Sequence, residues 1–236
     1  AAGVGFTLYP TDDAFVRQAE PTLNYGAAGA LAVAGPQAVN GAGQPQGRSD
    51  SAMKFDAAPA AMAFDEAFGE HRWNIISAVL QLNEQATPNN PVFNRGVGSF
   101  EVFWFDADEW VEGPGRPNKP PVATGNQMSY DWLQGHVDPA SEVSLGVFAN
   151  QGVDGPQSFT LYLAGPFLAE LEGGRVCSLH VAPASDTIGF TFNSVNFPGE
   201  AHRPRLILTA VPEPSAGLLL AGCMPVSYTH LTLPTN

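Results

Sequence analysis

Apolar and polar residues alternate with a period of two along most of the chain, and this pattern limits the possible folds more than any other feature. The clearest run is residues 76–83, in which four apolar side chains would share one face of an extended strand: Ile76, Ala78, Leu80 and Leu82. Similar runs are residues 14–17, 31–34, 52–56, 100–105, 145–149, 159–163, 176–181, 188–192 and 206–210. The pattern predicts about ten half-buried antiparallel strands.

The segments between these runs are rich in turn-forming residues. The chain has 25 Gly and 21 Pro but only 14% charged residues, which is typical of short strands joined by tight turns. Turn sequences occur at residues 40–43, 87–91, 112–115, 154–156 and 197–199.

One short helix is predicted over residues 166–171, because Pro166 suits a first helical turn and Gly173-Gly174 suits a helix end. We therefore expect an all-β fold: an antiparallel two-sheet β-sandwich of jelly-roll-like form with one short helix.

Residues 1–210 are expected to form one domain, because no composition shift or internal repeat divides them; two smaller domains are the alternative. After Ala210, the paired prolines Pro212 and Pro214 are expected to exclude a central strand and to end the fold.

The chain is acidic, with 10 Lys and Arg against 23 Asp and Glu and a formal net charge of −13. Such a surface repels polyanions, so nucleic acid is excluded as a partner. Oxygen-rich acidic loops suit hard cations such as Ca²⁺ instead. No apolar run approaches the roughly 20 residues that span a bilayer. The chain opens on Ala1, which fits either a cleaved signal peptide or an incomplete reading frame.

A series of short motifs follows a set order through residues 7–210. In chain order they are residues 11–16, the Asn24-Tyr25-Gly26 turn, residues 31–33 and 48–49, the Met53-Lys54-Phe55-Asp56 segment, residues 73–82, the Trp110-Val111-Glu112-Gly113 turn and residues 203–208. This order resembles the DNRLRE family, a disaggregatase-related group. The resemblance implies a mostly non-enzymatic β-sandwich module of exported proteins, and some relatives are similar to carbohydrate-binding modules for acidic or algal polysaccharides.

A second resemblance lies after the expected domain. Residues 211–224 resemble the start of a PEP-CTERM sorting signal, but the apolar run breaks at Cys223-Met224-Pro225 and no basic cluster follows. Residues 225–236 resemble translated sequencing-adapter read-through and are expected to be a non-native tail. The sorting resemblance implies secretion to the cell surface or extracellular matrix, with exosortase-type sorting machinery as a partner of the intact tail.

Asp12, Asp13 and Asn24 lie on either side of the first well-marked strand and offer several oxygen atoms, so they are candidate ligands of a structural Ca²⁺. The alternative is that Asp12 caps a turn and Asp13 is solvated. Residues 106–113 are not an EF-hand loop, because Trp110 stands where an oxygen ligand is needed. Their carboxylates are expected to be solvated.

Exposed aromatic rings are the candidates for carbohydrate contact, because the C–H faces of sugars stack on them. Trp104 shares a strand face with Phe100 and is expected in the core. Candidates for exposed rings fall in polar or Gly-rich segments: Trp110, Tyr130 and Trp132. The alternative is that these rings are buried, as aromatic residues more often are.

Sequence motifs of common enzymes are missing. The five histidines lack the paired spacing of a zinc site, and no G-x-S-x-G, P-loop or dinucleotide fingerprint occurs. We therefore expect an exported, non-catalytic module with polysaccharide as its candidate ligand. The alternatives are a structural matrix protein without ligand and a polysaccharide-degrading enzyme, for which a deep cleft with converging carboxylates would be the discriminating feature.

Overall fold

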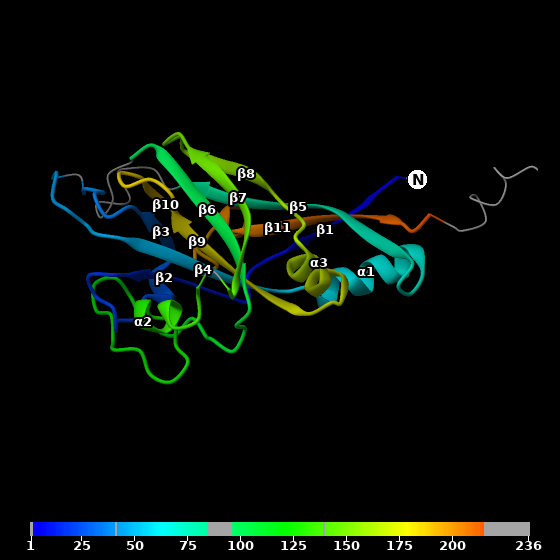
Figure 1. The fold of residues 1–236 in the computed structure, drawn as a ribbon, viewed down its shortest axis with the longest axis horizontal. Helices are drawn as coiled ribbons and strands as arrows, with labels where there is room; N and C mark the ends of the chain where they lie inside the picture. The colour runs from blue at the N-terminus through cyan, green and yellow to red at the C-terminus, as the bar shows by residue number, and fades with distance from the viewer. Residues whose placement is uncertain (1, 41, 85–95, 139, 215–236) are drawn as a thin grey trace, which may run out of the picture.

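The computed structural model describes residues 2–40, 42–84, 96–138 and 140–214 (Figure 1). Its strands are all paired antiparallel. They are β1 (Val4–Leu8), β2 (Asp12–Arg17), β3 (Ala30–Ala34), β4 (Ser49–Asp56), β5 (Trp73–Glu84), β6 (Gly98–Phe105), β7 (Glu142–Asn150), β8 (Gly155–Leu161), β9 (Val176–Pro183), β10 (Gly189–Asn193) and β11 (Arg205–Pro212).

The strands form two packed layers. They follow the order β1-β11-β5-β10-β3-β4-β9-β6-β7, with β8 paired to β5 and β2 paired to β4. The two layers join at a weak corner, where β3 meets β4 through the single pair Ala34 and Ser49. One apolar core lies between the layers and includes Leu80, Phe100 and Phe190, all fully buried. The predicted all-β sandwich is confirmed.

Each of the ten predicted runs overlaps one strand, although residues 162–163 lie beyond the end of β8 and residue 188 lies before β10. The face assigned to Ile76 is wrong. A β-bulge opposite Thr209 and Ala210 shifts the register of β5. Ile75 therefore points into the core, while Ile76 is 56% exposed. The prediction from alternation also missed β1, a strand of five residues in which Gly5 weakens the apolar and polar pattern.

The described residues contain three α-helices, so the expectation of a single short helix is wrong in number. The expected one is α3 (Gly165–Glu172), with Phe167 and Leu171 buried. The overlooked helices are α1 (Ala58–Phe68) and α2 (Tyr130–Gln134). α1 had a readable signal, since alanine favours helix and Gly69 follows its last turn. None of the helices in the described part of the chain is long and apolar enough to cross a membrane.

The predicted end of the fold at Ala210 is too early. β11 continues to Pro212, with Val211 paired to Asn74 and Pro212 paired to Trp73. Proline is tolerated there because β1 ends its pairing with β11 at Ala210, so β11 is an edge at that point. The rest of the expected sorting segment and tail, from residue 215, lies outside the described residues, as does the turn predicted at residues 87–91.

Candidate functional site

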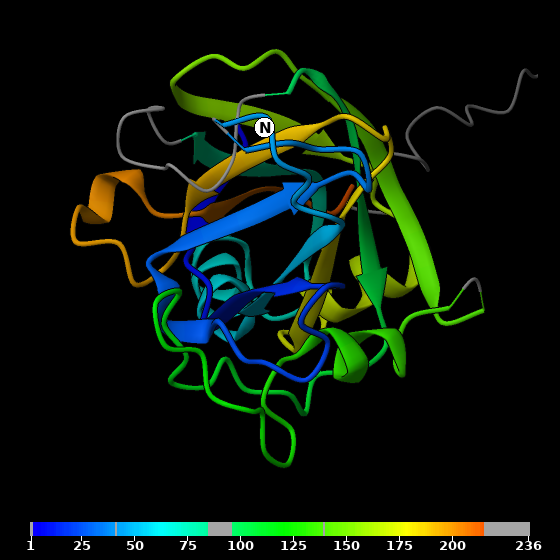
Figure 2. The same ribbon diagram turned by 90° about the vertical axis from the view of Figure 1, so that its left-hand side faces the viewer.

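The segment between β6 and β7 lies against the outer face of β2 and β4, which is the face turned away from the main core (Figures 1 and 2). We call residues 106–138 the covering segment. It closes a second, smaller apolar cluster: Ala14, Val16, Ala52, Phe105, Ala107, Trp110, Met128 and Leu133. The outer face of the layer that contains β2 and β4 is therefore partly buried beneath a long connection with little regular structure.

Trp110 anchors the covering segment. Its side chain is fully buried, and its indole N–H donates to Ser178 Oγ at 3.0 Å. The ammonium group of Lys54 lies 4.9 Å from the ring centroid and donates to the Trp110 carbonyl. The prediction that Trp110 offers an exposed ring is wrong, because its loop folds back over the sheet.

Asn24 fastens the same segment through its side chain. The amide nitrogen donates to the carbonyls of Glu112 and Met128, at 2.5 and 2.8 Å. The amide oxygen accepts from the N–H groups of Gly115 and Gly26, at 2.8 and 3.4 Å. Because both ends of this fully buried side chain have backbone partners, Asn24 acts as a structural bracket.

The two aspartates of the calcium prediction point to different places. Asp12 forms an ion pair with Lys54 at 3.1 Å, whereas Asp13 is fully buried and accepts from the N–H of Val195 at 2.6 Å. Burial raises the pKa of Asp13 well above its usual value; the Val195 hydrogen bond opposes this shift, and nearby Glu112 adds to it. The alternative that Asp13 is solvated is wrong.

Asp12, Asp13 and Asn24 thus have mostly protein partners, although Asp13 Oδ1 has none. Among the described residues, no group of three or more His, Cys, Asp or Glu side chains is arranged to hold a metal ion. The calcium site stays a prediction.

Tyr130 and Trp132 lie on the short helix α2, which Ser129 caps by accepting from the N–H of Trp132. Both rings are partly exposed. The ring of Trp132 stacks on His136 with centroids 3.8 Å apart and planes 13° apart. One ring face of Trp132 is therefore already covered.

A hollow of about 350 Å³ opens where the end of β6, helix α3 and the start of β9 meet. Its lining combines three carboxylates with one guanidinium and a small apolar wall: Asp106, Asp108, Glu170, Arg175, Trp104, Pro166 and Val176. Trp104 is almost fully buried, as expected, but its indole N–H donates to Glu170 Oε2 at 2.5 Å. Asp108 Oδ1 accepts from Ser178 Oγ at 2.6 Å. Two of the acids are thus held in defined positions.

Two carboxyl groups of this hollow, those of Asp108 and Glu170, have pKa values raised above the ordinary ones. Burial is the main cause that raises the pKa of Asp108, and the Ser178 hydroxyl partly offsets it. Burial likewise raises the pKa of Glu170; the Trp104 hydrogen bond lowers it, and Asp108 raises it again. The expectation that the acids of residues 106–113 are simply solvated is therefore wrong for Asp108.

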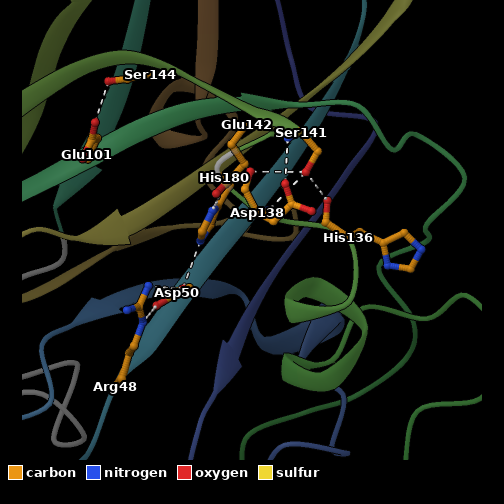
Figure 3. Close-up of polar contacts among 9 residues, drawn as sticks. All are labelled: Arg48, Asp50, Glu101, His136, Asp138, Ser141, Glu142, Ser144 and His180. Atoms are coloured by element: carbon orange, nitrogen blue, oxygen red, sulfur yellow. Dashed lines mark hydrogen bonds and ion pairs between the residues drawn. The ribbon is translucent and has the colours of Figure 1, made fainter.

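A second polar group lies on the same outer sheet face, away from the hollow. Figure 3 shows His180 between two carboxylates, with Asp50 at 3.0 Å from Nε2 and Glu142 at 2.5 Å from Nδ1. Arg48 completes the row through a two-point contact with Asp50, at 2.8 and 2.9 Å. Burial lowers the pKa of His180, but its hydrogen bonds to the two carboxylates outweigh this effect and raise the pKa to about 9. These four side chains form a charge-balanced ion network, in which His180 and Asp50 are buried and Arg48 is partly exposed.

The candidate site in the structure therefore consists of residues other than those predicted from the sequence, with Asp108 and Glu170 at its centre. Asp108 and Glu170 are 62 positions apart in the chain, and α3 brings the second beside the first. Only the fold provides that proximity. The readable signal was local: acids directly after a strand that ends in Trp104 and Phe105.

No protein-family model and no curated protein matched the chain when its sequence was compared with both. The DNRLRE and PEP-CTERM resemblances therefore stay predictions.

Proposed function

We propose that this chain is an exported, non-catalytic module of the cell surface or extracellular matrix, and that it binds a polysaccharide in the hollow beside α3. The observation that carries the proposal is the lining of that hollow, where Asp106, Asp108, Glu170 and Arg175 border an apolar wall. Such a mixed lining can accept a sugar, because a sugar presents both hydroxyl groups and apolar C–H faces.

The held carboxylates suit hydroxyl recognition. A carboxylate can accept several hydrogen bonds. Glu170 can therefore accept more than the one from the Trp104 indole, and Asp108 more than the one from the Ser178 hydroxyl. Arg175 supplies donors at the rim. Because the chain carries a net charge of −13, neutral glycans fit this site better than acidic ones.

Export is the second part of the proposal and is supported by the resemblance of residues 211–224 to a sorting signal. The high Gly and Pro content and the small share of charged residues also suit an exported β-protein. Expression of the gene in a bacterium with an exosortase, followed by cell fractionation, tests this part. Recovery of the protein only from the cytoplasm would contradict it.

A glycan array probed with the full chain tests binding. We expect Glu170→Gln and Asp108→Asn to weaken binding by about 1–3 kcal/mol, the size of an interface hot spot. Glu66→Gln is the matched control, because Glu66 is exposed on α1, outside the lining of the hollow. If the parent binds no glycan, the structural-matrix alternative replaces the proposal.

Glycoside hydrolysis is the second candidate, favoured by one observation. Asp108 and Glu170 converge in one hollow and both have raised pKa values, as a general acid requires. Release of new reducing ends from a bound polysaccharide, abolished by Glu170→Gln, would establish hydrolysis. Binding without release, over a long incubation, would support the non-catalytic proposal.

A further inference from the structure

The layer made of β1, β11, β5 and β8 has an open outer face. Alternation along these strands, together with the bulge at Ile76, turns one set of residues outward: Gly5, Thr7, Arg205, Ile207, Thr209, Ile76, Ser77, Val79, Gln81, Pro156, Ser158 and Thr160. All are exposed or half-buried. Tyr162 follows on the same alternation and is 70% exposed. We call this set the open face.

The open face differs in charge from the rest of the molecule. The chain contains 23 Asp and Glu, yet none of them belongs to the open face, whose one charged residue is Arg205. The opposite layer is different, because its outer side carries Asp50, Glu101 and Glu142. A partner recognised by carboxylates, such as a basic protein or a cation, therefore has no reason to choose the open face.

The size of the open face also limits its occupant. Four strands about 4.8 Å apart span about 14 Å, and the five residues from Arg205 to Thr209 span a similar length. A stable protein interface takes about 20–30 residues from each partner, whereas the open face has 13, with Tyr162 included. A second copy of the chain, which also carries a net charge of −13, is thus a poor fit.

The chemistry of the open face suits a slender polymer of hydroxyl-bearing rings. Hydroxyl groups of Thr7, Thr160 and Ser158 lie at its margins, while Val79 and Ile207 occupy its centre on one row. Tyr162 provides an exposed ring at one edge. Such a surface offers hydrogen bonds and apolar contact without charge.

We propose that the open face is a second glycan-contact surface, which binds an extended, neutral polysaccharide along its flat side. The inference rests on the proposed function only in the class of ligand, since the hollow beside α3 belongs to a different part of the molecule. The hollow accommodates a short stretch of sugar; the open face adds contact with the surface of a polymer.

Sedimentation of the full chain with particles of cellulose, chitin and β-1,3-glucan tests this inference. We expect Thr160→Glu and Tyr162→Ala each to weaken binding to one of these particles about tenfold or more. Val147→Glu is the matched control, because Val147 is 59% exposed on β7 and places the same charge elsewhere. This control should bind as the parent does.

The hollow and the open face are separated by a second measurement, binding of soluble oligosaccharides. Glu170→Gln should lose oligosaccharide binding and keep most particle binding, whereas Thr160→Glu should show the reverse. The inference is overturned if the parent binds none of the three particles, or if Thr160→Glu binds them as well as Val147→Glu does. A dimer in analytical ultracentrifugation that Thr160→Glu dissociates would overturn it in favour of self-association.

Discussion

Trp110 and Trp132 show how one residue type takes opposite roles within a single connection. Trp110 is fully buried between the covering segment and the sheet, whereas Trp132 is partly exposed on α2. Local sequence made both look like loop residues. Tertiary packing separates them, because only Trp110 reaches the outer face of β4 and β9.

The two tryptophans therefore have different mutational consequences. Trp110→Ala should lower the free energy of unfolding by about 3–5 kcal/mol, since it opens a large cavity and leaves Lys54 without its aromatic contact. Trp132→Ala should cost under about 1 kcal/mol. Urea unfolding followed by circular dichroism measures both. Equal losses would contradict the difference in burial between the two side chains.

The free energy of unfolding should decrease at alkaline pH, because His180 loses its proton there. Its pKa of about 9 in the folded state lies above the unfolded value near 6.5, so protonation favours the fold. The stabilisation is fully present below about pH 6.5 and is lost as the pH rises through 9, with a size of about 3 kcal/mol. Its neighbours are Asp50 on β4, Glu142 on β7, Phe103 on β6 and, beyond Asp50, Arg48.

Urea unfolding at pH 6.5 and 9.5 checks this prediction. His180→Gln should be less stable than the parent at pH 6.5, because two carboxylates lose a charged partner, and the difference should shrink at pH 9.5. Tyr25 is the control group for alkaline titration, since its pKa of about 12 lies above the range. A constant difference at both pH values would contradict the protonated state of His180.

At the scale of elements, the covering segment depends on contacts with distant strands rather than on its own regular structure. α2 is only five residues long, and most of the remaining segment is turn or coil. Side chains from the first quarter of the chain fix it, Asn24 and Lys54 among them. The position of Asp108 in the hollow therefore depends indirectly on residues far away in sequence.

Asn24→Ala should loosen this segment. The change leaves the carbonyls of Glu112 and Met128 and the N–H of Gly115 without their partner, which should cost about 2–4 kcal/mol. Limited proteolysis should then cut the covering segment faster than in the parent. Asn118→Ala is the control, because Asn118 is exposed and lies in the same segment. Similar cleavage in both variants would show that Asn24 is not the bracket.

The calcium prediction also belongs to this scale, because β2 holds both aspartates. Bound Ca²⁺ would stabilise the folded state by mass action, so chelator should lower the melting temperature and Asp12→Ala should remove that sensitivity. Asp56→Ala is the comparison, since Asp56 lies at the end of β4 and caps the N–H of Ala58. An unchanged melt in excess chelator would eliminate a cation that stabilises the fold.

The whole molecule is a sandwich whose last strand, β11, lies between β1 and β5. The C-terminal residues of the described part therefore stabilise the fold up to Glu213, whose N–H donates to the carbonyl of Arg72. Residues 211–213 therefore belong to the folded domain, although the paired prolines predicted that the fold ends before them.

Truncation separates the two parts of the tail. Removal of residues 215–236 should leave the melting temperature unchanged, because the expected sorting segment and tail are not predicted to pack on the domain. Removal from residue 211 onward should lower it, by about 2–4 °C for each kcal/mol lost, because the pairs of Val211 with Asn74 and Pro212 with Trp73 disappear. A large fall in the melting temperature when only residues 215–236 are removed would show that the tail packs on the domain.

Period-two alternation by itself determined the class of the fold and the approximate place of ten strands, because side chains on a pleated strand must alternate between core and solvent. The burial of Trp104 followed from the same rule. The bulge that turns Ile76 outward could not be read, since a bulge depends on the register of the neighbouring strand.

The candidate site, by contrast, was decided by tertiary structure. Asp108 and Glu170 each look like an ordinary surface acid in sequence, and their raised pKa values arise from burial that α3 and β9 create together. In the same way, Trp110 became a core residue because the covering segment folds back on the sheet. Local patterns report which face of a strand is apolar, whereas a site depends on contacts between segments that are far apart in the chain.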